Sequence, residues 1–201
     1  MLISTEKTKS LVISKDPIRC KLVVNDRIIE QVMNIKYLGV EITSDGNNNK
    51  EARQQVMKGA RISGYLRDVT WKNKYLRTES KVKIYKTMVR PVLTYAAETR
   101  AGTSRIKQLL LTAEMSTLRN IVGKTRRDRI RNSAIREECG VVDIGKFVRK
   151  RRREWNDHVG RAGYERLIKI ARDRKPTGRR DVGRPRKRWL ESWVSTSVET
   201  P

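Results

Sequence analysis

The chain has 201 residues, of which 47 are Lys or Arg and 22 are Asp or Glu, giving a formal net charge of +25. This length suits one domain or two small ones, and a hydrophobic fraction of 37% with a single Phe predicts a thin core of Val, Ile and Leu. No run approaches the roughly 18 apolar residues of a membrane span, and no secretory signal opens the chain, so we expect an intracellular protein without membrane contact. The only cysteines are Cys20 and Cys139, which are far apart in the sequence and do not indicate a disulfide framework. Together with the single histidine, His158, they provide three ligands, one fewer than a closed zinc site needs.

The first 46 residues are predicted to form β-structure. An apolar run at residues 11–13 fits a short strand, and residues 21–24 and 28–32 flank Asn25-Asp26, a dipeptide that favours the tight turn of a hairpin. A further run at residues 37–42 fits a strand and ends in a polar, asparagine-rich segment that is typical of a loop. Together these runs predict a small antiparallel sheet.

After this loop the apolar residues repeat at helical spacing. Residues 49–70 carry one apolar stripe, Thr78 is a suitable N-cap for a second helix, and Pro91 is expected to kink that helix or to end it. A third helix is predicted over residues 106–122 and is closed by Gly123. Three amphipathic helices with short connections predict a helical bundle.

The remaining residues are more basic and less apolar. Residues 126–139 and 144–159 are compatible with helices, and Phe147 and Trp155 are the large apolar anchors of the second. Residues 172–188 are rich in Gly, Pro and cations and have little to bury, so we expect them to be disordered when unbound.

Trp189 and Trp193 stand one helical turn apart and fit a short terminal helix, in which they either cover a small hydrophobic patch or stack on bases.

The predicted fold class is α+β, mostly α, with a partly disordered C-terminal tail. Its segments are a β-segment at 1–46, a helical bundle at 47–140, a basic helical region at 141–171 and a basic tail at 172–201.

The positive charge is concentrated toward the C-terminus. Residues 146–188 contain 18 basic and 5 acidic residues, a net charge of +13. Such a density repels itself unless a polyanion neutralises it, and release of counterions from phosphates favours that pairing. We therefore predict a nucleic-acid partner. The alternatives are a solvated basic face or a nuclear-import signal, and either import or nucleic-acid binding suits a nuclear protein.

Several short motifs follow one another along the chain. They are Thr5-Glu6-Lys7-Thr8-Lys9, Tyr37-Leu38-Gly39, Arg90-Pro91-Val92-Leu93-Thr94-Tyr95, Asp128-Arg129-Ile130-Arg131-Asn132, and two tail segments at 155–161 and 178–189. In this order they resemble the C-terminal part of the endonuclease/reverse transcriptases of non-LTR (LINE-like) retrotransposons. The resemblance implies that residues 1–46 are the end of the palm, with the Lys-Thr-Lys segment as motif D and the Tyr-Leu-Gly strand in the primer grip. It also implies a thumb at 47–140, followed by the family's basic tail.

The polymerase centre of that family needs carboxylates that hold Mg²⁺ between the primer 3′-OH and the incoming triphosphate. The family supplies them upstream of motif D, partly from an Asp-Asp turn, whereas this sequence has no adjacent Asp pair. The resemblance therefore implies a C-terminal fragment, with Met1 as an internal start, that is no enzyme by itself and needs no cofactor; Mg²⁺ belongs to the intact enzyme. The chain also departs from the family at Ala96-Ala97, where Gly-Ser is usual, and at Arg100, where Trp is typical.

Other groupings of acidic residues do not predict a catalytic site. Asp157 and His158 are neighbours on a predicted helix, so their side chains point about 100° apart. The spacing of Asp68, Glu79 and Lys81 resembles that of some nucleases, but Glu79 fits the first turn of a helix, where a carboxylate is favoured by the helix dipole. We therefore predict no catalytic and no metal-binding residues.

The resemblance places Lys7 and Lys9 near phosphates, and Tyr37 and Gly39 near the primer terminus. The alternatives are that the lysines are only solvated and that Tyr37 packs on the first helix. In the tail, the segment 183–185 is close to an AT-hook core, although Val replaces its first arginine at position 182, and it predicts weakly specific contact with a minor groove. The remaining predicted contacts are basic: Arg149, Lys150, Arg151, Arg152, Arg153, Arg179, Arg180, Arg184, Arg186, Lys187 and Arg188.

The function that these features predict is binding of RNA, DNA or a hybrid duplex, with helices presenting Lys and Arg to the backbone of a template–primer or target. No small-molecule substrate is expected. One alternative is a host-adopted chromatin or RNA-binding module that uses the AT-hook-like tail. Another is a decayed reading frame without function, which folds only in part because its sheet exposes an edge.

Overall fold

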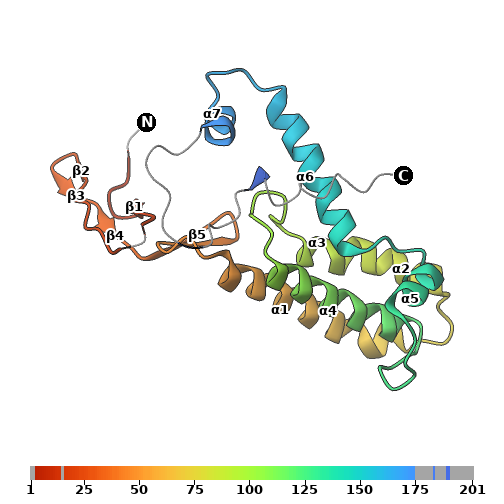
Figure 1. The fold of residues 1–201 in the computed structure, drawn as a ribbon. Coiled ribbons are helices and arrows are strands. Elements are labelled where there is room, and N and C mark those ends of the chain that lie inside the picture. The colour runs from red at the N-terminus through yellow and green to blue at the C-terminus, as the bar shows by residue number, and fades with distance from the viewer. Residues whose placement is uncertain (1–2, 15, 175–182, 184–188, 191–201) are drawn as a thin grey trace. The chain divides into compact units, whose positions relative to one another are not determined.

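The structure is a computed structural model and describes residues 3–14, 16–174, 183, 189 and 190 (Figure 1). Its described residues confirm an α+β fold that is mostly α-helical. The chain divides into two units, Met1–Gln54 and Gln55–Pro201, and the boundary falls inside helix α1, Asn48–Leu66.

The first unit contains the predicted hairpin. Strands β2, Val23–Val24, and β3, Arg27–Ile28, pair antiparallel, with Val24 opposite Arg27. Asn25 and Asp26 both have positive φ, 50° and 59°. A two-residue turn that matches the twist of a hairpin requires this conformation at both positions, and Asn and Asp adopt it more readily than most residues. The hairpin turn predicted at Asn25-Asp26 is therefore confirmed.

A second hairpin corrects the strand predicted at residues 37–42. Strands β5, Asn34–Tyr37, and β6, Val40–Thr43, are antiparallel, with Tyr37 opposite Val40. Leu38 and Gly39 form the turn between them and have φ of 48° and 83°. Gly39 adopts this conformation without steric cost, which allows the chain to reverse in the middle of an apolar run.

The third strand pair corrects the expectation of a purely antiparallel sheet. Strand β1, Lys9–Ser10, pairs in parallel with β4, Glu30–Gln31. The run at residues 11–13 follows β1 and is not itself a strand. Ile29, which separates β3 from β4 in the sequence, is buried. Ile13 and Ile28 are each 63% exposed, so this unit buries little apolar surface.

The second unit begins with the C-terminal part of α1, which continues as the π-helical turn η1, Arg67–Trp71. Trp71 is 2% exposed, and its Nε1 donates a hydrogen bond to the Ser63 carbonyl at 2.8 Å. Lys81 is also buried, and its Nζ donates to the Trp71 carbonyl at 2.8 Å. These bonds fix the turn that joins the first two helices.

The predicted second helix consists of α2, Thr78–Ile84, the π-helical η2, Tyr85–Val89, and α3, Arg90–Leu93. Thr78 is the first helical residue and extended Arg77 precedes it without a side-chain cap, so the prediction of Thr78 as N-cap is wrong by one residue. Pro91 lies in the first turn of α3. Since proline lacks an N–H and crowds the carbonyl four residues earlier, a change of helical register before it is expected.

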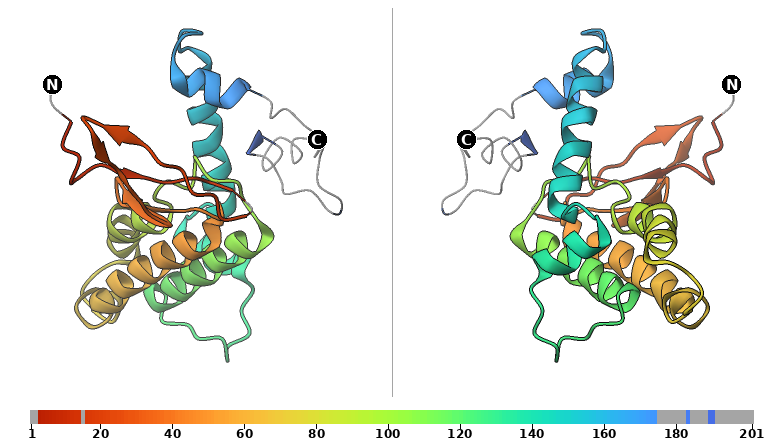
Figure 2. Two further views of the ribbon diagram at one scale, coloured as in Figure 1. Left: turned by 90° about the vertical axis from the view of Figure 1, so that its left-hand side faces the viewer. Right: turned by 90° about the vertical axis from the view of Figure 1, so that its right-hand side faces the viewer.

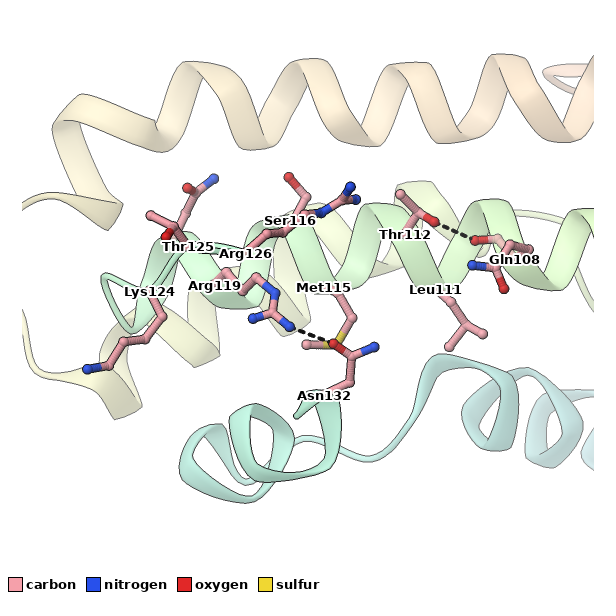
Figure 3. A pocket seen from close by; sticks show the side chains of 11 residues that line it. Gln108, Leu111, Thr112, Met115, Ser116, Arg119, Lys124, Thr125, Arg126 and Asn132 are labelled. Atoms are coloured by element: carbon pink, nitrogen blue, oxygen red, sulfur yellow. Dashed lines mark hydrogen bonds between the residues drawn. The ribbon is translucent and has the colours of Figure 1, made fainter. Parts of the chain in front are cut away.

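Helix α4, Ser104–Ile121, confirms the third predicted helix. Thr103 caps it by accepting a hydrogen bond from the Ile106 N–H at 3.2 Å, and Gly123 follows it with φ of 67°. Figure 3 shows α4 between α1 and α5. Three shorter or more basic helices follow: α5, Asn132–Cys139; α6, Ile144–Gly160; and α7, Leu167–Asp173.

The helix predicted at 126–139 is shorter than expected, because residues 124–131 form a loop. The Asp128 carboxylate accepts hydrogen bonds from the Thr125 N–H at 2.6 Å and from its hydroxyl at 2.9 Å. Such short-range bonds satisfy the backbone in a turn and compete with a helix.

Glu114 links three helices in the core of the second unit. It is fully buried on α4, and its Oε2 accepts bonds from Arg136 Nε at 3.0 Å and Nη2 at 2.8 Å. The Ile144 N–H at the start of α6 and the Tyr85 hydroxyl also contact it, each at 3.4 Å. Helix α7 then returns against α6 (Figure 2), where Arg172 Nη1 donates to the Asn156 carbonyl at 3.1 Å.

Candidate nucleic-acid interface

Helix α6 presents most of the predicted basic cluster on its outer side. Asp143 caps the helix by accepting hydrogen bonds from two backbone N–H groups, and Ile144, Val148 and Val159 are buried. Of the cluster at 149–153, Lys150, Arg151 and Arg153 are exposed and Arg149 is half-buried. We call these four residues the α6 basic face.

Arg152 is an exception, because it is only 6% exposed. Its Nε donates to the Ala97 carbonyl at 3.0 Å and its Nη2 to the Arg100 carbonyl at 2.9 Å. It lies four residues after Val148, on the buried stripe of α6, and this position aims the side chain into the protein. The expectation that Arg152 contacts nucleic acid is therefore corrected: it holds the turn that precedes α4.

Arg100 lies beside Arg152 and is also buried. Its Nη2 donates to the Tyr95 carbonyl at 3.1 Å. Burial, with a smaller contribution from the charge of Arg152, lowers the pKa of Arg100 to about 10. Arg100 therefore remains a cation at neutral pH, and backbone carbonyls accept hydrogen bonds from both guanidinium groups.

The loop at residues 123–131, here called the basic loop, was not among the predicted contacts. It has five cations and one carboxylate, and all six side chains are exposed: Lys124, Arg126, Arg127, Asp128, Arg129 and Arg131. The bonds from Thr125 lower the pKa of Asp128, so this carboxylate stays ionised and keeps the turn closed. The density of cations in this segment is the signal in the sequence that indicates this surface.

Arg119 connects the basic loop to α4. Its Nη2 donates to the Ile130 carbonyl at 3.1 Å and to Asn132 Oδ1 at 2.7 Å, the bond drawn in Figure 3. These bonds fix both ends of the connection from α4 to α5.

A polar groove of about 610 Å³ lies where α4, the basic loop and the start of α5 meet (Figure 3). We call it the α4 groove. No Asp or Glu is among its lining residues, which are Gln108, Leu111, Thr112, Met115, Ser116, Arg119, Asn120, Lys124, Thr125, Arg126 and Asn132. A more apolar groove of about 490 Å³ adjoins it between α1 and α4, and Gln108, Thr112 and Ser116 line both.

The predicted contacts of the first unit lie on its surface. Lys7 is exposed, and Lys9 on β1 forms an ion pair with Glu30 on β4. Tyr37 is 62% exposed within this surface. Gly39 belongs to the hairpin turn rather than to a strand.

The basic residues of the tail lie outside the described residues: Arg179, Arg180, Arg184, Arg186, Lys187 and Arg188. Trp193 also lies outside them, whereas Trp189 is half-buried and its Nε1 donates to the Glu98 carbonyl at 2.6 Å. Trp189 thus contacts the same turn that Arg152 holds.

The acidic groupings considered above are engaged in other contacts. Asp68 pairs with Lys72 at 2.7 Å, and His158 stacks on Trp155 with ring centroids 5.5 Å apart.

Burial raises the pKa of the Cys139 thiol to about 11, so this thiol is protonated at neutral pH. Among the described residues, no three His, Cys, Asp or Glu side chains gather closely enough to hold a metal ion.

A scan against protein-family models, a search of curated proteins and a search of solved structures each found no match. Within the described part of the chain, no helix has the length and apolar character needed to cross a membrane.

Proposed function

We propose that the protein binds nucleic acid through the backbone phosphates and does not itself join nucleotides. The observation that carries the proposal is the charge on two stretches of the second unit, which helix α5 separates in the sequence. Helix α6 and the basic loop present ten cations that are exposed or half-buried, against three carboxylates. Glu154 contacts Arg151 at 3.4 Å, and Asp128 is bound within its own loop.

A surface of this kind gains free energy from phosphate because condensed counterions are released when the cations replace them. Solubility alone needs a net charge of only about 2–8 on a small domain, well below the +25 of this chain. Import requires one short basic segment and does not account for cations on both α6 and the basic loop.

The resemblance to non-LTR retrotransposon reverse transcriptases gives this proposal a more specific form. The protein would then be the thumb and tail of an RNA-directed DNA polymerase that acts in the nucleus. It would hold the template–primer or the target while the intact enzyme supplies the catalytic carboxylates and Mg²⁺. A second candidate, a chromatin or RNA-binding module, is favoured by the AT-hook-like sequence at 183–185.

Binding measured by fluorescence anisotropy tests the proposal and separates the two candidates. The probes are RNA and DNA duplexes and their hybrid, and the variants each remove four cations. One replaces the α6 basic face by Gln, and the other replaces Arg184, Arg186, Lys187 and Arg188 by Gln. We expect the α6 variant to weaken binding by roughly tenfold or more at about 100 mM salt. A loss confined to the tail variant would instead support the second candidate.

Primer extension with Mg²⁺ or Mn²⁺ tests the second half of the proposal. No synthesis by the purified chain is expected. Template-dependent extension that survives further purification would overturn the claim that the chain does not join nucleotides.

A further inference from the structure

The α4 groove has the donor chemistry of a site for a phosphodiester strand. Gln108, Thr112, Ser116 and Asn120 recur along α4 at four-residue spacing and give one wall an uncharged polar lining. The cations Arg119, Lys124 and Arg126 also line the groove, and no carboxylate among the lining residues competes for them. The lining is therefore complementary to an anion that also carries hydrogen-bonding groups.

The donors at the loop end of the groove are held in place before any ligand binds. Arg119 donates to Asn132 Oδ1, so the amide oxygen of Asn132 is used and its NH₂ group remains a donor. Arg119 Nη1 is shielded from solvent and lacks a hydrogen-bond partner among the described residues. Arg119 is thus a positioning residue, which fixes Asn132 and the basic loop, while exposed Lys124 and Arg126 supply positive charge.

The size of the groove favours a single strand over a duplex. Its volume of about 610 Å³ lies in the range of sites for small organic ligands, which suits one unpaired nucleotide. The wall from Gln108 to Asn120 is about 18 Å long at 1.5 Å per residue, so neighbouring nucleotides of the same strand can follow α4 beyond the one in the groove. Amide and hydroxyl side chains can pair with the edges of unpaired bases, which a duplex would hide.

We infer that the α4 groove binds single-stranded nucleic acid, with Lys124 and Arg126 on the phosphates and the polar side chains of α4 along the strand. This inference rests on the proposed function and adds the site and the form of the ligand.

A pair of matched double variants tests the role of the two cations. Lys124→Ala/Arg126→Ala removes them, and Lys74→Ala/Lys83→Ala removes two exposed lysines outside the groove and so changes the net charge equally. Anisotropy is measured with a single strand of about 12 nucleotides, as RNA and as DNA, and with a duplex of the same sequence. We expect the groove variant to bind both single strands roughly tenfold more weakly, and the control roughly threefold more weakly or less.

A second pair of variants blocks the groove without changing charge. Thr112 lines the groove, Thr87 does not, and each is exposed and donates its hydroxyl to the carbonyl four residues earlier, both at 2.9 Å. We expect Thr112→Trp to weaken single-strand binding by roughly fivefold or more with little effect on the duplex, and Thr87→Trp to change neither.

Equal losses in the groove and control variants, or a loss of duplex binding that matches the loss of single-strand binding, would overturn the inference and leave the proposed function standing. If the unaltered chain binds none of the probes at about 50 mM salt, the proposed function itself fails.

Discussion

Arg152 and Arg153 are adjacent in the sequence and have different roles in the structure. Successive side chains on a helix point about 100° apart, so Arg152 enters the core while Arg153 stays exposed. Arg152 satisfies the carbonyls of Ala97 and Arg100, and Gly102 lies against its guanidinium, where a Cβ atom would be 2.8 Å from Nη1.

We therefore predict that two substitutions that change the charge equally affect different properties, one the stability of the protein and the other its binding of nucleic acid. Arg152→Ala leaves two backbone carbonyls without their donor and should lower the free energy of unfolding by about 2–4 kcal/mol. Arg153→Ala should change it by no more than about 0.5 kcal/mol and should weaken oligonucleotide binding instead. Urea unfolding followed by circular dichroism measures the first effect, and similar stabilities for the two variants would contradict the assignment.

Glu114 gives the fold a dependence on pH. Burial raises the pKa of this carboxyl, and Arg136 opposes the shift in part. The folded state therefore holds the proton more tightly than the unfolded chain. The stabilisation from this group is fully present below the unfolded value near 4.5 and is lost as pH rises through the folded pKa.

The expected consequence is visible in a comparison with Glu114→Gln, whose side chain does not titrate. The free energy of unfolding of the unaltered protein, minus that of the variant, should decrease as pH rises from about 4 toward neutrality. Denaturant unfolding at several pH values gives this difference. A difference that increases with pH would show that the ion pair with Arg136 outweighs the cost of burial.

Two glycines on helix α1 occupy different surroundings. A Cβ at Gly59 would lie 2.4 Å from Leu93 Cδ2, whereas a Cβ at Gly64 would meet nothing within 4 Å. Leu93 is fully buried on α3, so Gly59 permits close packing between the two helices.

Alanine substitution should therefore change the free energy of unfolding in opposite directions at these two positions. Gly64→Ala should stabilise the protein by about 0.5–1 kcal/mol, because alanine is the better helix former. Gly59→Ala should destabilise it by about 1–3 kcal/mol, because the added methyl group displaces a packed leucine. Thermal unfolding of both variants checks this, and stabilisation by both would mean that α1 and α3 do not pack closely.

The helices of the second unit could be predicted because their apolar residues repeat over long stretches. Turns that interrupt apolar runs could not, and Leu38-Gly39 shows why: only the paired positive φ angles distinguish this turn from a continuous strand. The α4 groove was also beyond prediction, since it depends on Arg119 meeting Asn132 across a loop whose shape is set by Asp128. The burial of Arg152 was in principle predictable, because it occupies the apolar stripe of its helix.

One physical property of the protein, its net charge, accounts for the proposed function. A net charge of +25 raises the local concentration of polyanions and opposes the folded state through self-repulsion. Phosphate contact relieves that repulsion, and the cations of α6 and the basic loop are placed where a strand can reach them.

The most direct test of nucleic-acid binding is the salt dependence of affinity for the unaltered chain. Anisotropy titrations from about 50 to 400 mM NaCl should give a straight line of log affinity against log salt. A slope of about −5 is expected, which is a loss of roughly a thousandfold between about 50 and 200 mM and corresponds to about six phosphate contacts on a duplex. Absence of binding at the lowest salt, or an affinity that does not change with salt, would contradict the account.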